Sequence, residues 1–249
     1  MIEAHNLGVT FPGGTEALKG INVTIDDGEF IAVIGLSGAG KSTFLRTLNG
    51  LVKPTTGSVR VGGVDVGSLS GKALQRFRRT VGFIFQQFNL VTRLSAIDNV
   101  LHGRIGYLPT WRGLMGLYGE RDYELAAAYL DEVGLAEKKD VRVDSLSGGQ
   151  QQRVAIARAM AQEPQLVLAD EPMASLDPRL SDVILGLLKD YNEARGVTVL
   201  VNIHVLELAR RYAQRVLAFN QGRLVFDGPV ADLTEDLAEQ IYAGSLEAL

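Results

Sequence analysis

Eight consecutive residues near the N-terminus carry the strongest chemical signal in the sequence. They match the pattern G-x-x-x-x-G-K-[ST], in which glycines let the backbone curl so that successive N–H groups point at phosphate oxygens. Lys41 would reach the β- and γ-phosphates of a nucleotide, and the Ser42 hydroxyl would coordinate Mg²⁺. The predicted nucleotide contacts are Gly35, Leu36, Ser37, Gly38, Ala39, Gly40, Lys41, Ser42 and Thr43. A glycine-rich turn without function is the competing interpretation, but an apolar run precedes the motif and a helical pattern follows it, as phosphate binding requires.

Two adjacent acids, Asp170 and Glu171, follow the apolar run Leu166–Ala169. Sheets of α/β proteins place ligands at the carboxyl ends of their strands, so this is where a ligand site is expected. Asp170 would hold Mg²⁺ through a water, and Glu171 would accept a proton from an attacking water. By itself, a strand followed by two acids also fits an exposed acidic turn. Together with the phosphate loop it indicates a hydrolytic site.

A third motif, Leu146–Gln150, reads Leu-Ser-Gly-Gly-Gln and precedes an apolar, alanine-rich helical pattern. Ser147 is predicted to be the N-cap of that helix. The amides of Gly148 and Gly149 would then form a second anion-binding surface at the positive end of the helix.

The elements around these motifs indicate an α/β fold. Phe30–Ile34 is a continuous apolar run, which favours a strand that is buried on both faces. Further strands are expected at Ile2–Phe11, Ala17–Ile25, Ser58–Val61, Val81–Phe85, Leu166–Ala169 and Thr198–Ile203. Helical patterns occur at Ser42–Asn49, over most of 70–161 and at Asp182–Ala194, and Asn220–Gly222 fits the turn of a final hairpin. This alternation predicts a parallel sheet wrapped by helices.

The composition excludes several classes of function. A chain of 249 residues with 46% hydrophobic residues suits one large domain or a core domain with a lobe. Lysine and arginine total 25 against 29 acids, which argues against a nucleic-acid binder working by bulk positive charge. The sequence has no cysteine, so disulfides, iron–sulfur clusters and cysteine nucleophiles are excluded. No apolar stretch approaches the roughly 18 residues of a membrane span, and no secretory signal is apparent, so a soluble, intracellular chain is expected.

The three motifs in this order resemble those of the nucleotide-binding subunits of ATP-binding cassette (ABC) transporters. By that resemblance Gly35–Ser42 is the Walker A motif, Leu166–Glu171 the Walker B motif and Leu146–Gln150 the signature. The resemblance covers practically the whole chain. It implies an α/β fold with a RecA-like P-loop NTPase core, an N-terminal antiparallel β subdomain and an α-helical signature subdomain. The chain would be a single ABC ATPase domain, with core residues 1–86 and 162–249 and a helical subdomain at about 87–161.

The resemblance places further site residues one at a time. Phe11 matches the aromatic that stacks on adenine, where the family more often has tyrosine, and packing in the core is the alternative. Gln86 matches the Q-loop glutamine that contacts Mg²⁺ and the attacking water, and His204 matches the switch histidine that senses the γ-phosphate. Ser175–Asp177 resembles the D-loop at the seam between two domains. The implied catalytic residues are Glu171, His204, Gln86 and Lys41, and the implied metal ligands are Ser42, Gln86 and Asp170.

The family's architecture also implies partners. Two such domains pair head to tail, so that Ser147, Gly148, Gly149 and Gln150 of one copy close over ATP bound to the second copy. A separate domain without membrane spans resembles importers, whose transmembrane permease subunits and periplasmic or lipid-anchored solute-binding protein are other chains. Such a subunit would lie peripherally on the cytoplasmic face of the inner membrane. No nucleic acid is expected as a partner.

The more variable segments resemble phosphonate import ATP-binding proteins and their phosphite-transporting relatives. The segments concerned are Gln86–Ser95, Asn99–Gly103, Ala169–Pro178 and His204–Pro229. Where that subgroup usually has a small polar residue before the switch, this chain has Asn202. Two alternatives remain. One is an importer for amino acids or another anion, and the other is a soluble ABC ATPase without transport, although no second cassette or coiled-coil insertion is apparent.

The stretch Arg104–Tyr118 reads as an insertion and resembles the same subgroup. It contains three aromatic residues, including Trp111, the sequence's only tryptophan. Exposed aromatics here would form a contact with a membrane subunit. The alternative is that these side chains pack inside the helical lobe.

Overall fold

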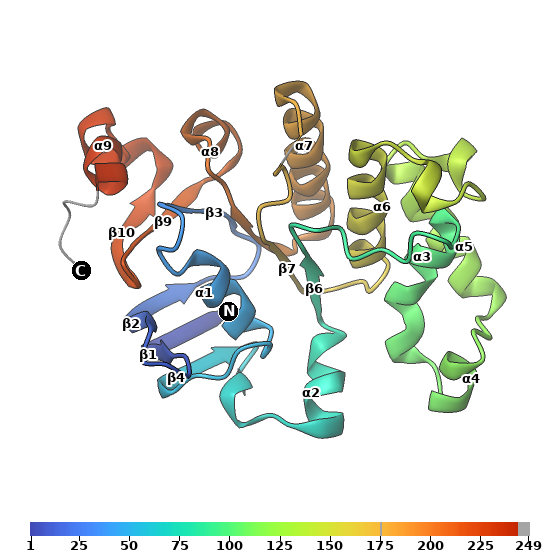
Figure 1. Cartoon of the computed structure of the whole chain (residues 1–249), viewed down its shortest axis with the longest axis horizontal. Coiled ribbons are helices and arrows are strands. Elements are labelled where there is room, and N and C mark those ends of the chain that lie inside the picture. The colour runs from blue at the N-terminus through green and yellow to red at the C-terminus, as the bar shows by residue number, and fades with distance from the viewer. Residues whose placement is uncertain (175, 244–249) are drawn as a thin grey trace.

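The computed structural model describes residues 1–174 and 176–243 and contains two β-sheets flanked by helices (Figure 1). The strands are β1 (Ile2–Thr10), β2 (Glu16–Ile25), β3 (Phe30–Gly35), β4 (Thr56–Val61), β5 (Val64–Asp65), β6 (Val81–Ile84), β7 (Leu166–Ala169), β8 (Thr198–Asn202), β9 (Arg215–Asn220) and β10 (Arg223–Pro229). The α-helices are α1 (Lys41–Leu48), α2 (Gly71–Arg78), α3 (Ala96–Leu101), α4 (Thr110–Leu114), α5 (Glu120–Glu132), α6 (Gly148–Met160), α7 (Pro178–Arg195), α8 (Leu206–Tyr212) and α9 (Glu235–Ala243). Short 3₁₀ turns lie at Val66–Ser68, η2 (His102–Tyr107), Ala136–Lys138, Val143–Ser145 and Val230–Asp232.

The six-stranded sheet has the order β10-β9-β3-β8-β7-β6. Its strands β3, β6, β7 and β8 run parallel, β9 runs parallel to β3, and β10 pairs with β9 in the antiparallel sense at one edge. Parallel strands end at the same edge of a sheet. The residues that follow β3, β6, β7 and β8, which include the phosphate loop and the two acids, are therefore gathered at one edge.

The second sheet is antiparallel, with the order β2-β1-β4-β5, and it packs on one face of the parallel sheet. Strand β3 is buried on both faces, as its apolar sequence predicts. Ala32 and Ile34 pack toward the helices, whereas Ile31 and Val33 pack toward the antiparallel sheet. The expected fold class, a P-loop core with an antiparallel β subdomain and a helical part, is confirmed.

Helices α3, α4, α5 and α6 gather beyond β6 at one end of the molecule, whereas α9 and β10 lie at the other end with the antiparallel sheet beside them (Figure 1). The expectation of mostly helical structure over 70–161 is wrong between α3 and α5, where only 3₁₀ turns and the five-residue α4 form. Gly106, Pro109, Gly113 and Gly116 explain the difference because glycine and proline disfavour helix interiors. The proposed domain bounds stay a prediction. Within the described residues, no helix is both long and apolar enough to cross a membrane.

Candidate active site

The phosphate loop joins the buried end of β3 to the start of α1. Gly35 has φ +134°, and a Cβ there would lie 2.1 Å from the Phe219 carbonyl oxygen. Gly40 has φ +105°, and a Cβ there would lie 2.5 Å from the Ala17 carbonyl oxygen. Both positions need glycine because the backbone is left-handed and other backbone approaches it closely. The loop is therefore held in its curled shape by its surroundings.

Lys41 is the first residue of α1 and is only 3% exposed. Its Nζ donates hydrogen bonds to the Gly35 and Leu36 carbonyl oxygens, each at 2.8 Å. Burial lowers the pKa of the Lys41 ammonium, while the charges of Glu171 and Asp170 partly oppose that shift. A buried cation at the mouth of the loop is suited to an anionic ligand such as a nucleotide phosphate.

Asp170 follows β7 and is 2% exposed, with hydrogen bonds from three side chains. Ser42 Oγ donates to Oδ1 at 2.6 Å, and Arg46 Nη2 donates to Oδ2 at 3.1 Å. Asn202 Nδ2 also donates to Oδ1, at 3.1 Å. These hydrogen bonds matter because burying a polar group without partners is costly. Ser42 and Asp170 were predicted to share a metal site, whereas no role was predicted for Arg46 or Asn202.

Both missed residues carry a signal that a reader of the sequence could use. Arg46 lies four residues after Ser42, so the two share a face of α1. Asn202 is the last residue of β8, follows three apolar residues and is fully buried. A buried amide implies a hydrogen-bond partner. Without the fold, however, neither pattern identifies Asp170 as the partner.

Glu171 makes contacts with two of the three other predicted catalytic residues, His204 and Gln86. Its Oε1 lies 2.6 Å from His204 Nε2, and its Oε2 accepts a hydrogen bond from Gln86 Nε2 at 3.0 Å. Glu171 has φ +51°, a left-handed backbone conformation that is uncommon for residues other than glycine. The structure thus brings Glu171, His204 and Gln86 together from the ends of three parallel strands. It assigns the contact to Gln86 rather than to the adjacent Gln87.

Two hollows open beside this cluster. A cavity of about 440 Å³ is lined by Glu171, His204 and Asn202 together with residues of α7 and α8. A groove of about 590 Å³ runs along the Gln86–Leu90 loop and reaches Gln151 on α6. A carboxylate between a histidine and an amide, next to open space, can hold a water and accept its proton.

The signature residues are at the start of α6. Ser147 caps the helix by accepting a hydrogen bond from the Gln150 amide, and the Gln150 side chain accepts one from the Ser147 amide. The first amides of a helix have no carbonyl partner within it, so those of Gly148 and Gly149 are suited to an anion. Gly149 packs against Leu180, with a hypothetical Cβ only 2.0 Å from Leu180 Cδ2.

In Figure 1, α7 and β7 lie between α6 and α1, so the signature and the phosphate loop of one chain do not form one site. Phe11, just past the end of β1, is 40% exposed, so the alternative of a core position is wrong. Of the predicted D-loop, Ser175 lies outside the described residues. Asp177 accepts a hydrogen bond from the Leu180 amide at 3.0 Å and caps α7.

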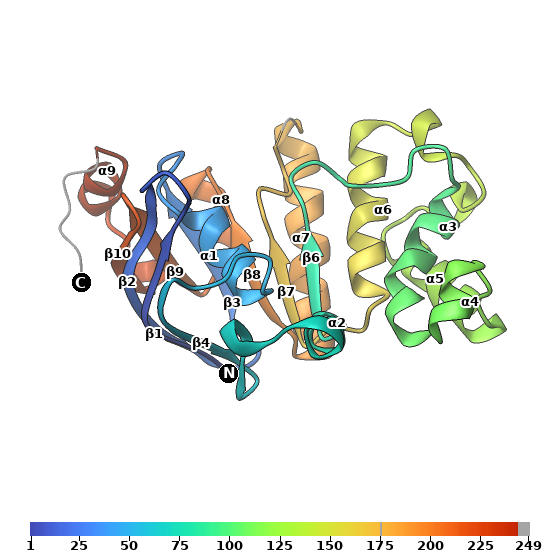
Figure 2. The same cartoon turned by 60° about the horizontal axis from the view of Figure 1, so that its bottom comes forward.

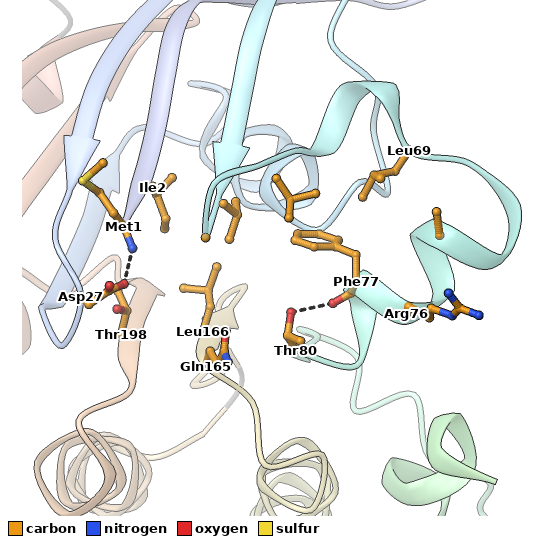
Figure 3. Close-up of a pocket in the computed structure, with 14 residues that line it drawn as sticks. Met1, Ile2, Asp27, Leu69, Arg76, Phe77, Thr80, Gln165, Leu166 and Thr198 are labelled. Carbon is orange, nitrogen blue, oxygen red and sulfur yellow. Dashed lines mark hydrogen bonds and ion pairs between the residues drawn. The ribbon is translucent and has the colours of Figure 1, made fainter.

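A further cavity, of about 470 Å³, lies at the opposite edge of the sheet (Figure 3). Its lining includes Leu166 and Thr198, the first residues of β7 and β8, together with Phe77 of α2. The hydrolytic cluster lies at the carboxyl ends of the same strands. The cavity therefore takes no part in the site described above.

The donor atoms present fit a magnesium ion. The Ser42 hydroxyl and the Asp170 carboxylate meet at 2.6 Å. Gln86, whose Nε2 contacts Glu171, also carries a side-chain carbonyl oxygen that could serve as a ligand. Oxygen ligands of this kind are those that Mg²⁺ prefers. No cluster of three or more histidine, cysteine or acidic side chains suited to a metal occurs in the described part of the chain.

The comparisons with known proteins agree with this geometry. A family model described as ABC transporter matches residues 18–174, and the chain belongs to this family. The phosphonates import ATP-binding protein PhnC of Bacillus cereus is 48% identical over 242 residues, which cover 97% of this chain and 94% of that protein. PhnC 3 of Halalkalibacterium halodurans is 46% identical over 242 residues, with the same coverage.

Solved structures give the same result for the fold. The dimeric ATP-binding cassette MJ0796, bound to ADP and phosphate, is 36% identical with a TM-score of 0.80 and covers 92% of this chain and 99% of that one. A nucleotide-free ATP-binding cassette from an ABC transporter has a TM-score of 0.82 at 24% identity, with coverage of 97% and 94%. The latter supports the fold alone.

Proposed function

We propose that this protein is the ATP-hydrolysing subunit of an ABC importer that takes up phosphonate or a related phosphorus oxyanion such as phosphite. The observation that carries the hydrolytic part is the contact of Glu171 with both His204 and Gln86 beside the phosphate loop. The cargo is supported by relatives of 46–48% identity that are named phosphonates import ATP-binding proteins.

In the proposed reaction, the oxygen of water bonds to the γ-phosphorus of ATP held by the phosphate loop, and the bond from that phosphorus to the β,γ-bridging oxygen breaks, so that ADP and phosphate are released. Glu171 accepts the proton of that water, while His204 and Gln86 hold the carboxylate in place. Lys41 would exchange its hydrogen bonds with the loop carbonyls for the β- and γ-phosphates. Backbone amides of residues 35–43 would surround the phosphates, and Phe11 would stack on the adenine.

Ser42, Asp170 and Gln86 would hold Mg²⁺, which when bound neutralises charge on the β- and γ-phosphate oxygens. Arg46 and Asn202 would keep the Asp170 carboxylate oriented, as metal ligands generally need supporting hydrogen bonds. These two residues are positioning residues in this proposal because neither touches the ligand itself.

A second copy of the chain would complete the site. The Gly148 and Gly149 amides lie apart from the chain's own phosphate loop, so Ser147–Gln150 of the partner would close over the γ-phosphate. ADP lacks that phosphate and would not bridge the two copies. Light scattering of Glu171→Gln should therefore give a dimer with ATP and a monomer with ADP. Equal sizes in the two nucleotides would contradict the head-to-tail arrangement.

Transmembrane permease subunits would be the membrane partners, so that the protein lies peripherally on the cytoplasmic face of the inner membrane. The Gln86–Leu90 loop is proposed as their contact because it links the Glu171 cluster to α6. Arg158 of α6 donates hydrogen bonds to the Phe88 and Asn89 carbonyl oxygens, the former at 2.9 Å. A solute-binding protein would act only indirectly, by delivering cargo to the permease.

A complementation experiment tests the proposal. The gene is introduced into a bacterial host that lacks its own phosphonate-importer ATPase but carries the matching permease and binding protein of this system. Growth on methylphosphonate as the sole phosphorus source should be restored, and Glu171→Gln should not restore it. Growth on phosphate is the control. Failure on methylphosphonate and phosphite alike, with the protein expressed and hydrolysing ATP, would assign the ATPase to another cargo.

A further inference from the structure

The segment between η2 and α5 carries an apolar surface that no described residue covers. Trp111, Leu114 and Met115 are 63%, 87% and 68% exposed, and α4 contributes no buried residue. We call this the α4 surface; its residues are Ile105, Tyr107, Trp111, Leu114, Met115 and Leu117. Figures 1 and 2 show α4 at the outer end of the helical part, beside α5. The alternative of packing inside the lobe is therefore wrong for Trp111.

The α4 surface is built on a fixed base. The Tyr107 hydroxyl donates to the Gln162 carbonyl oxygen at 2.7 Å, and the Arg104 guanidinium lies 4.2 Å from the centre of the Tyr107 ring. Arg104 also donates to the Ala161 carbonyl oxygen at 3.0 Å. Gly113 of α4 lies against Ile105, with a hypothetical Cβ 3.2 Å from Ile105 Cγ1. The exposed side chains are thus presented on an anchored segment.

Residues 99–119, which carry this surface, contain two arginines and no acid, although the whole chain has a net charge of −4 and Glu120 and Asp122 flank Arg121. No acidic residue occurs in the sequence between Asp98 and Glu120. The Arg112 guanidinium lies 6.0 Å from the Trp111 ring. Neither Arg112 nor Arg121 forms an ion pair with any residue that the structure describes. The surface therefore combines exposed apolar side chains with arginines that have no ion-pair partner among the described residues.

A second copy of the chain is not its partner in the proposed dimer. The α4 surface is tied to Ala161 and Gln162, at the C-terminal end of α6, whereas the signature begins at its N-terminal end. An α-helix of this length spans roughly 20 Å. A partner that meets the signature leaves the α4 surface open to another ligand.

We propose that the α4 surface is an interfacial membrane contact that inserts into the headgroup region of an anionic lipid bilayer. Trp111 would lie at the headgroup level, which tryptophan prefers, with Leu114 and Met115 reaching toward the acyl chains. Arg112 and Arg121 would pair with lipid phosphates. Protruding side chains need no matching groove when the partner is fluid, which favours lipid over a permease surface. The inference rests on the proposed function, since that function brings the protein to a membrane.

The only tryptophan makes the test direct, because all tryptophan fluorescence reports on Trp111. The full-length protein is titrated with vesicles of phosphatidylcholine and with vesicles of phosphatidylcholine and phosphatidylglycerol at two to one. The emission should shift to the blue and be quenched by lipids brominated on their acyl chains. Binding to the mixed vesicles should be roughly tenfold tighter or more, because two arginines meet anionic headgroups.

Variants separate the contributions. Leu114→Asp combined with Met115→Asp should abolish the blue shift and co-sedimentation with the mixed vesicles. Val64→Asp, at a residue 41% exposed on β5 in the other sheet, is the matched control and should bind as the wild type does. Arg112→Glu combined with Arg121→Glu should remove the preference for phosphatidylglycerol. Melting curves verify that each variant is folded.

Three outcomes would overturn the inference. They are the absence of a blue shift in the wild type, binding by the double aspartate variant, and a Trp111 response that needs the permease but not phosphatidylglycerol. The last outcome would assign the α4 surface to the permease. ATP hydrolysis and cargo uptake are measured on the same proteins, so failure of lipid binding with these activities intact leaves the proposed function standing.

Discussion

Replacing Glu171 with glutamine removes one proton acceptor and almost no volume. In the structure Oε1 lies 2.6 Å from His204 and Oε2 lies 3.0 Å from the Gln86 amide nitrogen. The carbonyl oxygen of the new glutamine can still accept a hydrogen bond from His204. Its NH₂ group can donate to Gln86 if the Gln86 amide rotates to present its oxygen. The cluster should therefore survive, while the general base is lost. Positioned acids and bases contribute about 10²–10⁴-fold in rate, which corresponds to about 2.7–5.5 kcal/mol of activation free energy.

Phosphate release and ATP binding, measured on the same preparation, check this prediction. Hydrolysis should fall by the factor above, whereas ATP affinity should stay within a few-fold because the phosphate loop is unchanged. Glu207→Gln is the matched control, since Glu207 is another carboxylate lining the same cavity and is exposed on α8. Hydrolysis by Glu171→Gln at the wild-type rate would refute the assigned role. A parallel loss of ATP affinity would mean that Glu171 supports the phosphate loop instead.

Three further predictions follow from single contacts. Lys41→Ala should weaken ATP binding by roughly 10–100-fold in a nucleotide titration, because a hydrogen bond to a charged group contributes about 1.5–3 kcal/mol. Gly149→Ala should lower the melting temperature by several degrees, since overpacking costs about 1–3 kcal/mol, and adding Leu180→Ala should recover part of it. Asn202→Ala should slow hydrolysis with little change in melting temperature, because it removes both a bond to Asp170 and an acceptor, Asn202 Oδ1, that has no partner among the described residues.

Local patterns in the sequence were enough to predict the elements of the parallel sheet. Strand β7 has the bounds that its apolar run predicts, and β3 differs by one residue. The region between α3 and α5 differs most. Its apolar residues suggest a long helix, but Pro109 and four nearby glycines, from Gly103 to Gly116, limit it to 3₁₀ structure and the five-residue α4. Whether the aromatic side chains of this region are buried or exposed depends on tertiary packing, which the spacing of apolar residues in the sequence does not show.

The candidate site likewise contains residues that local sequence patterns predict and residues that only the fold brings together. Gly35–Ser42 and the acids after β7 were predictable because each motif is a run of consecutive residues that can be recognised without the fold. The roles of Arg46 and Asn202 were not predictable, since each residue meets Asp170 only through the fold.

 Arg46 lies 124 residues before Asp170 in the chain, and Asn202 lies 32 residues after it. Only the pairing of β3 with β8 and of β7 with β8 brings these side chains to one carboxylate.

The contacts among the site residues explain why hydrolysis would depend on a second copy. Lys41 is held by two loop carbonyls, and Glu171 is held by His204 and Gln86. A nucleotide that binds here replaces the hydrogen bonds of Lys41 with contacts to its own phosphates, so the net gain from this lysine is smaller than the gross attraction. The amides of Gly148 and Gly149 have no such internal partners to give up. In the proposed dimer these amides would exchange hydrogen bonds with water for hydrogen bonds to the γ-phosphate, without breaking a contact inside the protein. Closure by a second copy would then be the step that distinguishes ATP from ADP, which lacks that phosphate.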